Sequence, residues 1–305
     1  MKILVFGSGG QVGSRVSAAF ANIKPLNGSC PVIVMANRDD IDLVDSARIP
    51  SFLADIAPDI IVNASAYTAV DKAESEEETA IAVNATAVGE MAKFCRSTES
   101  TFIHISTDYV FSGKDNTPYV ERDAVGPTSV YGRSKLAGEN AIRDRLTKHI
   151  ILRTSWVYGA VGNNFVKTML RLAQSRGELR VVADQFGAPT SASAIADTIA
   201  IIISQLADAG ELDARWGTYH FSGYPFISWS GFADEIFSQA LSRGLIETLP
   251  KVNPIGTVDY PTPAARPANS RLDCSKLQRT FGIGPDDWKR SLGFVLDELK
   301  ERIES

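Results

Sequence analysis

Short hydrophobic runs alternate with amphipathic stretches through the first half of the chain. The runs are typical of buried parallel strands and lie at residues 3–6, 31–36, 60–63, 102–106 and 150–153. Helical patterns lie between them, at residues 13–21, 50–57, 80–95 and 130–145. Strands that alternate with helices in this way predict an α/β fold with a Rossmann-like, doubly wound parallel sheet.

The alternation of strand and helix patterns becomes less regular after about residue 156. Further helices are predicted at 164–176, 191–206, 229–243 and from 288 onward, with a strand at 218–222 and a proline-rich loop at 250–267. We expect a dinucleotide-binding domain at 1–155, to which 185–220 returns. Residues 156–184 and 221–305 are expected to form a smaller α/β domain that binds the substrate at the carboxyl edge of the sheet.

Composition narrows the class of protein. The 31 basic and 36 acidic side chains give a net charge of −5, and 44% of the residues are hydrophobic. An acidic chain without Lys/Arg runs is poorly suited to nucleic acid. The longest apolar stretches, such as 195–203, are shorter than the roughly 20 residues that a membrane span needs, and the first apolar run is too short for a signal peptide. Three widely spaced cysteines favour a reducing cytoplasm over a disulfide scaffold.

A glycine pattern at the first strand–helix junction predicts a phosphate-binding loop. Gly7, Gly10 and Gly13 are spaced as GxxGxxG and enclose Gln11 and Val12. Glycines let the backbone approach a pyrophosphate, and the helix N-terminus offers free N–H groups to it. We therefore expect these five residues to bind a dinucleotide, although a glycine-rich turn without a ligand would show the same spacing.

The end of the second strand bears on which dinucleotide binds. An acidic residue there would favour NADH, whereas this chain has Arg38, which can pair with the 2′-phosphate of NADPH. NADPH is the expected cofactor, with NADH as the alternative, because a solvated surface arginine would look the same. Other residues expected to line the cofactor are Asp42, Leu43, Ala64, Ser65 and Ala66.

Tyr131 and Lys135 lie four residues apart, on one face of a predicted helix, and Thr107 and Asp108 end the fourth strand. This set suits the reduction of a ketone. A free phenol, with a pKa of about 10, is a weak acid near neutral pH, so we expect the Lys135 cation to lower the pKa of Tyr131. Lys135 can also hold the nicotinamide ribose, and Thr107 can stabilise the developing alkoxide.

Together these motifs resemble the extended short-chain dehydrogenase/reductases. Longer segments resemble the dTDP-4-dehydrorhamnose reductase family, and they are NASAYTAVDKAE (63–74), STDYVF (106–111), RTSWVY (153–158), GNNFVKTMLRL (162–172), DQFGAPT (184–190) and YPTPAARPANSRL (260–272). The resemblance implies NADPH-dependent reduction of the C4 ketone of dTDP-4-dehydro-β-L-rhamnose, the last step of dTDP-L-rhamnose biosynthesis. It implies that Tyr131 is the proton donor and that Lys135 binds the cofactor.

The resemblance also implies a set of substrate-binding residues, namely Thr107, Asp108, Tyr131, Trp156, Arg266 and Asn269. An aromatic side chain such as Trp156 can stack on a base or sugar, and the planar fork of Arg266 suits a diphosphate. His104, His149 and His220 are isolated in the sequence, so we interpret them as structural and expect no metal site.

Magnesium is doubtful as a second cofactor. Some members of the family are thought to dimerise through a magnesium ion held by acidic side chains after the glycine loop and after the APT segment. Here these stretches read Ser14-Arg15 and Ser191-Ala192-Ser193, and Arg15 would repel the ion. We expect a monomer, with a weak homodimer as the alternative.

Other functions share parts of this pattern. A 4,6-dehydratase needs a second carboxylate after Asp108, where this chain has Tyr109. Another nucleotide-sugar 4-ketoreductase or an epimerase, which would recycle bound NAD, stays open from the residues alone. In a different class, the regulatory beta subunit of methionine adenosyltransferase looks like this fold, but the set Thr107, Tyr131 and Lys135 favours an enzyme.

Overall fold

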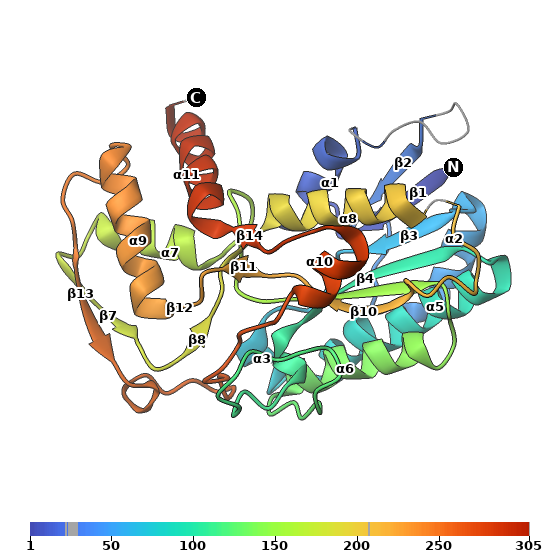
Figure 1. Cartoon of the computed structure of the whole chain (residues 1–305), viewed down its shortest axis with the longest axis horizontal. Coiled ribbons are helices and arrows are strands. Elements are labelled where there is room, and N and C mark those ends of the chain that lie inside the picture. Colours follow the sequence, from blue (N-terminus) through green and yellow to red (C-terminus); the bar gives the residue numbers. More distant parts are fainter. Residues whose placement is uncertain (22, 24–29, 207, 305) are drawn as a thin grey trace.

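The computed structural model describes residues 1–21, 23, 30–206 and 208–304, and two regions lie side by side in it (Figure 1). The sheet region contains six parallel strands in the order β10-β5-β4-β3-β1-β2. They are β1 (Lys2–Phe6), β2 (Val32–Ala36), β3 (Ile60–Asn63), β4 (Thr101–Thr107), β5 (His149–Thr154) and β10 (Gly217–His220). The predicted fold class is confirmed, because each of the predicted strands belongs to this parallel sheet.

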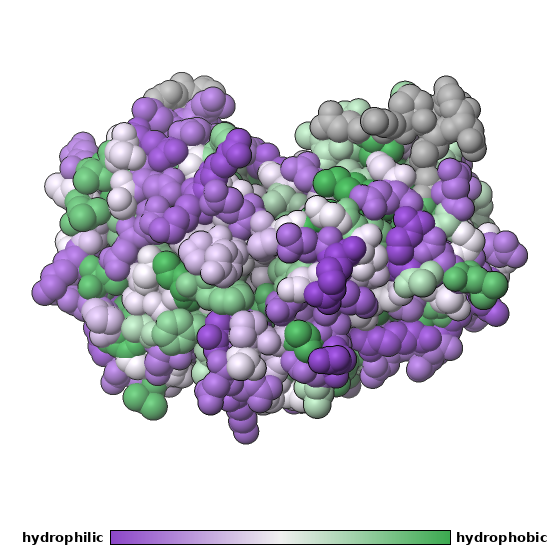
Figure 2. All heavy atoms as spheres, viewed as in Figure 1, coloured by the Kyte–Doolittle hydropathy of each residue, from purple (hydrophilic) through white to green (hydrophobic). Residues whose placement is uncertain are grey.

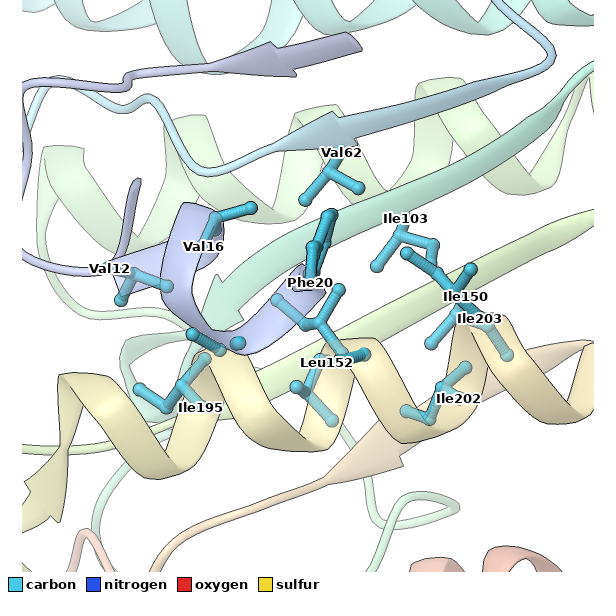
Figure 3. Packing of buried hydrophobic residues seen from close by; sticks show 14 of the residues in the cluster. Val12, Val16, Phe20, Val62, Ile103, Ile150, Leu152, Ile195, Ile202 and Ile203 are labelled. Carbon is cyan, nitrogen blue, oxygen red and sulfur yellow. The ribbon is translucent and has the colours of Figure 1, made fainter. Parts of the chain in front are cut away.

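Helices cover both faces of the sheet. On one face lie α1 (Gly13–Phe20), α8 (Ala192–Leu206) and α10 (Ser275–Phe281), whose side chains join Val62, Ile103 and Leu152 in one core (Figure 3). On the other face α2 (Ile49–Ile56), α5 (Ala87–Thr98) and α6 (Val130–Arg143) enclose a second core around Ile61 and Met91. A strand buried on both faces is mostly apolar, which is why the strands read as hydrophobic runs, and buried polar residues such as His104 and Arg153 require hydrogen-bond partners.

The predicted helix at 80–95 is confirmed as part of a continuous helical segment that consists of α4 (Glu77–Ile81), a wide π-helical turn at Ala82–Thr86 and α5. A short helix, α3 (Val70–Ala73), precedes it. The wide turn carries Asn84, whose side chain hydrogen-bonds both backbone groups of Tyr67 and the Ser134 hydroxyl. A Cβ at Gly138 of α6 would lie 2.1 Å from the Asn84 carbonyl oxygen, so the two backbones are in close contact there. Local turns of this kind cannot be seen in hydrophobic periodicity.

The second region consists of α7 (Phe165–Ala173), α9 (Trp229–Ser242) and α11 (Trp288–Glu304) with the parallel pair β7 (Glu178–Val182) and β13 (Lys251–Ile255). Its core is built around Tyr158, Phe232 and Trp288. The loop-rich stretch predicted at 250–267 also contains the strand β13, which the prediction did not include. Proline is tolerated in an edge strand, so Pro254 does not prevent pairing.

Short ladders and turns connect the two regions. The ladders are β6 (Val157–Tyr158) with β9 (Thr190–Ser191), β8 (Phe186–Gly187) with β12 (Ile227–Ser228), and β11 (Gly223–Tyr224) with β14 (Asp286–Asp287). Single 3₁₀ turns lie at Ser46–Arg48, Asp108–Val110 and Thr257–Asp259.

The chain crosses between the regions more than once. Segment 185–220 returns to the sheet region, where it supplies α8 and β10. Within 221–305, the range expected for the smaller domain, Leu277 and Phe281 of α10 pack into the core of the sheet region. The division of the chain into two domains therefore stays a prediction. Its bounds need one change, because α10 packs on the sheet region and not on the smaller one.

The face of the molecule drawn in Figure 2 is largely hydrophilic, with hydrophobic residues in small groups. In the part of the chain that the structure describes, no helix combines the length and the apolar character that crossing a membrane requires.

Candidate active site

The glycine loop lies where the sheet reverses its direction of winding. β1 pairs with β2 on one side and with β3 on the other, and the loop follows β1 directly. Gly7 has φ +81°, and a Cβ there would lie 2.7 Å from the Ser65 backbone nitrogen. A Cβ at Gly13 would lie 2.0 Å from the Gly7 carbonyl oxygen. Only glycine fits at these two positions, and no side chain caps the N-terminus of α1.

A cavity of about 330 Å³ opens beside this loop. The residues that were predicted to bind cofactor and that line it are Gly7, Arg38, Asp42, Leu43, Ser65 and Ala66, and Asn37, Tyr67 and Glu76 line it too. The Arg38 side chain is 80% exposed and lies 3.3 Å from Asp42. Hydrogen bonding by the Val44 backbone lowers the pKa of Asp42, so its carboxylate is charged and can hold Arg38 at the rim.

Two other predicted cofactor residues serve the structure with their side chains. Val12 is buried in the core, where it is drawn in Figure 3, so only its backbone is left for a ligand. The Gln11 amide oxygen accepts a hydrogen bond of 2.9 Å from Asn164, which begins α7 in the second region. Gln11 thus connects the glycine loop with the second region.

The catalytic candidates come together where β4 ends and α6 begins. Ser129 caps α6 by accepting a hydrogen bond from the Gly132 nitrogen, and the Thr107 hydroxyl accepts one from the Tyr109 nitrogen. The Tyr131 ring meets the Tyr109 ring edge-on, with 5.4 Å between the ring centroids. Because the helix begins directly above the strand end, the Tyr131 phenol faces the Thr107 hydroxyl.

The electrostatics differ from the prediction that Lys135 lowers the pKa of Tyr131. Burial raises the pKa of Tyr131 above its usual value, Thr107 opposes this effect and the Asp108 charge adds to it. Burial also lowers the pKa of Lys135 to about 8, against the attraction of Glu139. The Lys135 ammonium nitrogen Nζ donates 2.7 Å to the Ile105 carbonyl and lies 3.1 Å from His104 Nε2. The prediction is wrong for this structure, because burial dominates and Lys135 is not among the groups that shift the pKa of Tyr131.

Asp108 is buried beside Thr107, which donates a 3.1 Å hydrogen bond to its Oδ1. Burial raises the pKa of Asp108 to about 6, and hydrogen bonds from Ser270 and Thr107 oppose the rise. Its Oδ2 is buried and has no partner among the described residues. An unsatisfied buried carboxylate oxygen is costly, so this atom is a candidate ligand contact.

Sequence analysis did not find the buried ion pair that supports α6. Glu139, one turn after Lys135, accepts from Arg153 of β5 at 2.9 and 2.7 Å and from Ser106 of β4 at 2.6 Å. These partners lower the pKa of Glu139 despite its burial. The pair holds α6 against two strands and so holds Tyr131 and Lys135 in place. Its residues are far apart in the sequence, and no local motif marks them.

A larger cavity, of about 760 Å³, lies mainly in the second region. Trp156 and Arg266 line it, and Tyr109 reaches it from the catalytic side. Trp156 has φ +48° and stacks on Trp229 at 3.5 Å between ring centroids, while Gly187 packs so closely on its ring that a Cβ would lie 2.6 Å away. One face of the Trp156 ring is thus covered by Trp229, and Gly187 packs closely against the ring, so protein contacts restrict how a ligand can meet it.

Arg266 is held by a residue that sequence analysis also missed. It lies 2.7 Å from Asp71, and its Nη1 is buried without a partner among the described residues. Asp71, Gln185 and Trp229 line the same cavity. Asp71 and Gln185 belong to the segments 63–74 and 184–190 that carry the family resemblance, so those segments already contained the signal.

Asn269 is not among the residues that line this cavity. Its amide nitrogen donates to the carbonyls of Asp115 and Thr117, both at 2.8 Å, and its oxygen accepts from Arg271. The structure therefore gives Asn269 a role in holding the loop, and the neighbouring Ser270 lines the cavity instead.

Within the described ranges, no cluster of three or more His, Cys, Asp or Glu side chains could hold a metal ion. Arg15, at the position expected to repel magnesium, forms a 2.8 Å ion pair with Glu298 of α11. His149 and His220 hydrogen-bond the carbonyls of Leu146 and Tyr119. Burial lowers the pKa of both rings, to about 3 for His220, so they are neutral structural groups.

Comparison with known proteins points to one family. The model of the RmlD substrate binding domain matches residues 1–301. The dTDP-4-dehydrorhamnose reductase of Escherichia coli (strain K12) is 44% identical over 299 residues, which cover 98% of each chain. The crystal structure of a dTDP-4-dehydrorhamnose reductase from Clostridium acetobutylicum gives a TM-score of 0.86 at 35% identity and covers 98% of this chain and 100% of that one. The enzyme of that name from Bacillus anthracis, in complex with NADP, gives 0.83 at 34% identity and covers 97% and 99%.

Proposed function

The chain belongs to the RmlD substrate binding domain family, and we propose that it uses NADPH to reduce the C4 ketone of dTDP-4-dehydro-β-L-rhamnose to dTDP-β-L-rhamnose. One observation carries the proposal. Tyr67, which lines the smaller cavity, packs on the same small cluster as Tyr131, and Tyr109, which lines the larger cavity, contacts the Tyr131 ring. Tyr131 itself lines neither cavity, but a residue packed beside it reaches each one, and this supports a phenol positioned between a cofactor in one cavity and a substrate in the other.

The smaller cavity fits the adenosine half of NADPH. The glycine loop offers backbone N–H groups and the positive end of α1 to the pyrophosphate. Arg38, exposed at the rim in an ion pair with Asp42, can also pair with a 2′-phosphate, and Ser65 and Ala66 line the same cavity. The nicotinamide, when bound, supplies a hydride to the ketone carbon.

The chain's own residues supply the proton. As the ketone carbon gains the hydride, Tyr131 donates its phenolic proton to the ketone oxygen, which becomes the hydroxyl of the product. A raised pKa keeps Tyr131 in the acid form that this step requires. Thr107 turns its hydroxyl from Asp108 to the developing oxyanion, and Lys135 holds the ribose.

The larger cavity accommodates the sugar nucleotide. The buried Nη1 of Arg266 has no hydrogen-bond partner among the residues that the structure describes and could bind a diphosphate oxygen, with Asp71 holding the guanidinium in position. The aromatic wall that contains Trp156, Phe165 and Trp229 suits the apolar faces of a sugar or base.

We further propose that the enzyme acts as a monomer in the cytoplasm. Arg15 and Ser191 stand in the two stretches where acidic magnesium ligands would be required, and Arg15 forms its ion pair with Glu298 within one chain. Cys30, Cys95 and Cys274 are unpaired, as in a reducing compartment. Light scattering of the purified protein with magnesium or with a chelator tests the first point: a dimer that dissociates on chelation contradicts it.

The test of the function is the loss of absorbance of reduced nicotinamide. The protein is mixed with NADPH and dTDP-4-dehydro-6-deoxy-L-mannose, and dTDP-glucose, which has no ketone, serves as the control substrate. Consumption of NADPH with the keto sugar alone, and stoichiometric formation of dTDP-β-L-rhamnose, supports the proposal. Epimerisation without net NADPH consumption would favour the epimerase, and no turnover would reject the reductase.

A further inference from the structure

Gln11 faces both regions of the molecule. Its backbone lies in the glycine loop, where the N–H groups of Gln11 and Val12 have no backbone partner among the described residues. The Val12 side chain anchors this loop in the core of the sheet region (Figure 3). The Gln11 side chain reaches the second region, where its amide oxygen accepts from Asn164 Nδ2 at 2.9 Å. One residue thus offers a backbone donor to a dinucleotide and bonds the other region through its side chain.

The carbon atoms of Gln11 also pack against the loop that precedes α7. Gly162 in this loop has φ +73°, and a Cβ there would lie 3.1 Å from Gln11 Cγ. A side chain at Gly162 would be strained by that φ and would press on Gln11. The contact between the glycine loop and the start of α7 therefore combines close packing with a hydrogen bond.

The Asn164 amide has a single orientation. Its nitrogen donates to the Gln11 amide oxygen and, at 2.7 Å, to the Gly159 carbonyl. Its oxygen accepts from the Lys167 nitrogen at 3.1 Å and so caps α7. Both hydrogens of the nitrogen have acceptors and the oxygen has a donor, so nitrogen and oxygen cannot be exchanged. Asn164 thus fixes the first turn of α7 with one end of its amide and Gln11 with the other.

The helix that Asn164 caps forms part of the wall of the larger cavity. The residues of α7 that line this cavity are Phe165, Thr168, Met169 and Leu172. Phe165 directly follows Asn164 and packs on Trp229, with 4.7 Å between the ring centroids, and Trp229 stacks on Trp156. A shift at the start of α7 would therefore move side chains of the aromatic wall.

We propose that Asn164 is a positioning residue that, through its hydrogen bond with Gln11, couples a dinucleotide on the glycine loop to the wall of the larger cavity, so that dinucleotide and sugar nucleotide bind cooperatively. The proposal rests on the function proposed above, which places these two ligands. A pyrophosphate held by the loop N–H groups fixes the Gln11 backbone and so restricts its side chain against Asn164. The second ligand then meets a wall that is already ordered, and by linkage each ligand strengthens the binding of the other by the same factor.

A second contact between the two regions provides a matched control. Arg15 of α1 forms its 2.8 Å ion pair with Glu298 of α11, and both side chains are partly buried. Among the described residues, those that line the larger cavity include none from α11. Arg15→Gln therefore removes a contact between the same two regions but leaves the cap of α7 and its bond with Gln11 in place.

Calorimetric titration with dTDP, with and without saturating NADP⁺, measures the coupling without turnover. For the wild-type protein we expect the Kd for dTDP to be about tenfold lower when NADP⁺ is bound. Gln11→Met keeps the carbon atoms that pack on Gly162 but removes the acceptor, so the ratio of the two Kd values should fall to about two or less. Asn164→Ser keeps a capping hydroxyl for α7 but removes the amide, and it should lower the ratio to the same extent.

The double variant shows whether Gln11 and Asn164 act through their contact. If they do, Gln11→Met combined with Asn164→Ser should give the same ratio as either single variant. Arg15→Gln should keep the wild-type ratio. A wild-type ratio near one, single variants that keep the full ratio, or a loss in Arg15→Gln as large as that in Gln11→Met would overturn the proposal.

Hydrogen exchange of the wild-type protein decides the question even if the variants fail to fold. The Lys167 amide bonds Asn164 Oδ1 and the Thr168 amide bonds the Asn164 carbonyl, so NADP⁺ alone should slow the exchange of both by about fivefold. Unchanged exchange at the start of α7 would overturn the proposal. A protein that does not oxidise NADPH with the keto sugar contradicts the proposed function, whereas normal oxidation without coupling rejects this inference alone.

Discussion

The two regions of the molecule hold their functional side chains by different means. In the sheet region, Thr107, Tyr131 and Lys135 come from the end of a buried strand and the first turns of a capped helix. Buried polar bonds such as Glu139–Arg153 hold that helix in place. In the second region the cavity wall is made of stacked aromatic rings, two-stranded ladders and the loop that carries Arg266.

The contrast corresponds to two tasks. Proton donation requires atoms held to within a fraction of an ångström, and parallel strands with buried hydrogen bonds provide that rigidity. Recognition of a large sugar nucleotide requires a shaped apolar wall with a few polar contacts. Changes in the sheet region should therefore act on kcat, and changes in the second region on KM for the sugar.

The largest effect is expected from Tyr131→Phe, which removes the proposed proton donor of the sheet region. We expect kcat to fall about a thousandfold, with little change in the Kd for NADPH, because the ring still packs on Tyr109. Steady-state rates and fluorescence titration of NADPH measure the two quantities. A variant with comparable turnover would remove Tyr131 from the mechanism.

Asp108→Asn tests whether the buried Asp108 carboxylate lowers the stability of the folded protein. The pKa of Asp108 is about 6 in the folded protein and near 3.8 when unfolded, so its charge is unfavourable in the folded state above pH 6. At pH 7 the variant should be more stable by about 2 kcal/mol and less active, and the gain in stability should disappear below pH 4. Urea unfolding at both pH values measures this, and a loss of stability at pH 7 would contradict it.

Trp229→Ala tests the second region. Removing the ring that stacks on Trp156 should raise KM for the sugar nucleotide about tenfold and leave kcat within about threefold, because the wall loosens while the phenol stays in place. Initial rates at varied substrate concentration separate the two. If kcat falls as much as in Tyr131→Phe, the division of tasks between the regions is wrong.

The smallest effect is expected from Arg38→Ala at the exposed rim of the cofactor cavity. The Kd for NADPH should rise about fivefold and the Kd for NADH should stay the same, because only NADPH has a 2′-phosphate. Titration with both nucleotides measures the ratio. An equal rise in the Kd for NADPH and for NADH would show that Arg38 does not bind the 2′-phosphate.

Local signals in the sequence were sufficient for the sheet region. Continuous apolar runs marked the strands, the spacing of Gly7, Gly10 and Gly13 marked the loop, and the four-residue spacing placed Tyr131 and Lys135 together. These features depend on periodicity and on the absence of a Cβ, which any short stretch of sequence displays. The same reasoning missed β13 and the wide turn at Asn84, because partners distant in the sequence stabilise them.

The sequence by itself thus determined the fold class and was enough to predict the phosphate loop and the proton donor. Only the tertiary structure decided the electrostatics: burial raises the pKa of Tyr131, and Glu139, Arg153 and His104 form buried contacts with side chains of α6 or with one another. It also decided that Trp156 stacks on Trp229 and that Asn269 holds a loop. The physical reason is that desolvation and hydrogen bonding depend on which side chains meet in space, and folding sets this over distances that no local pattern contains.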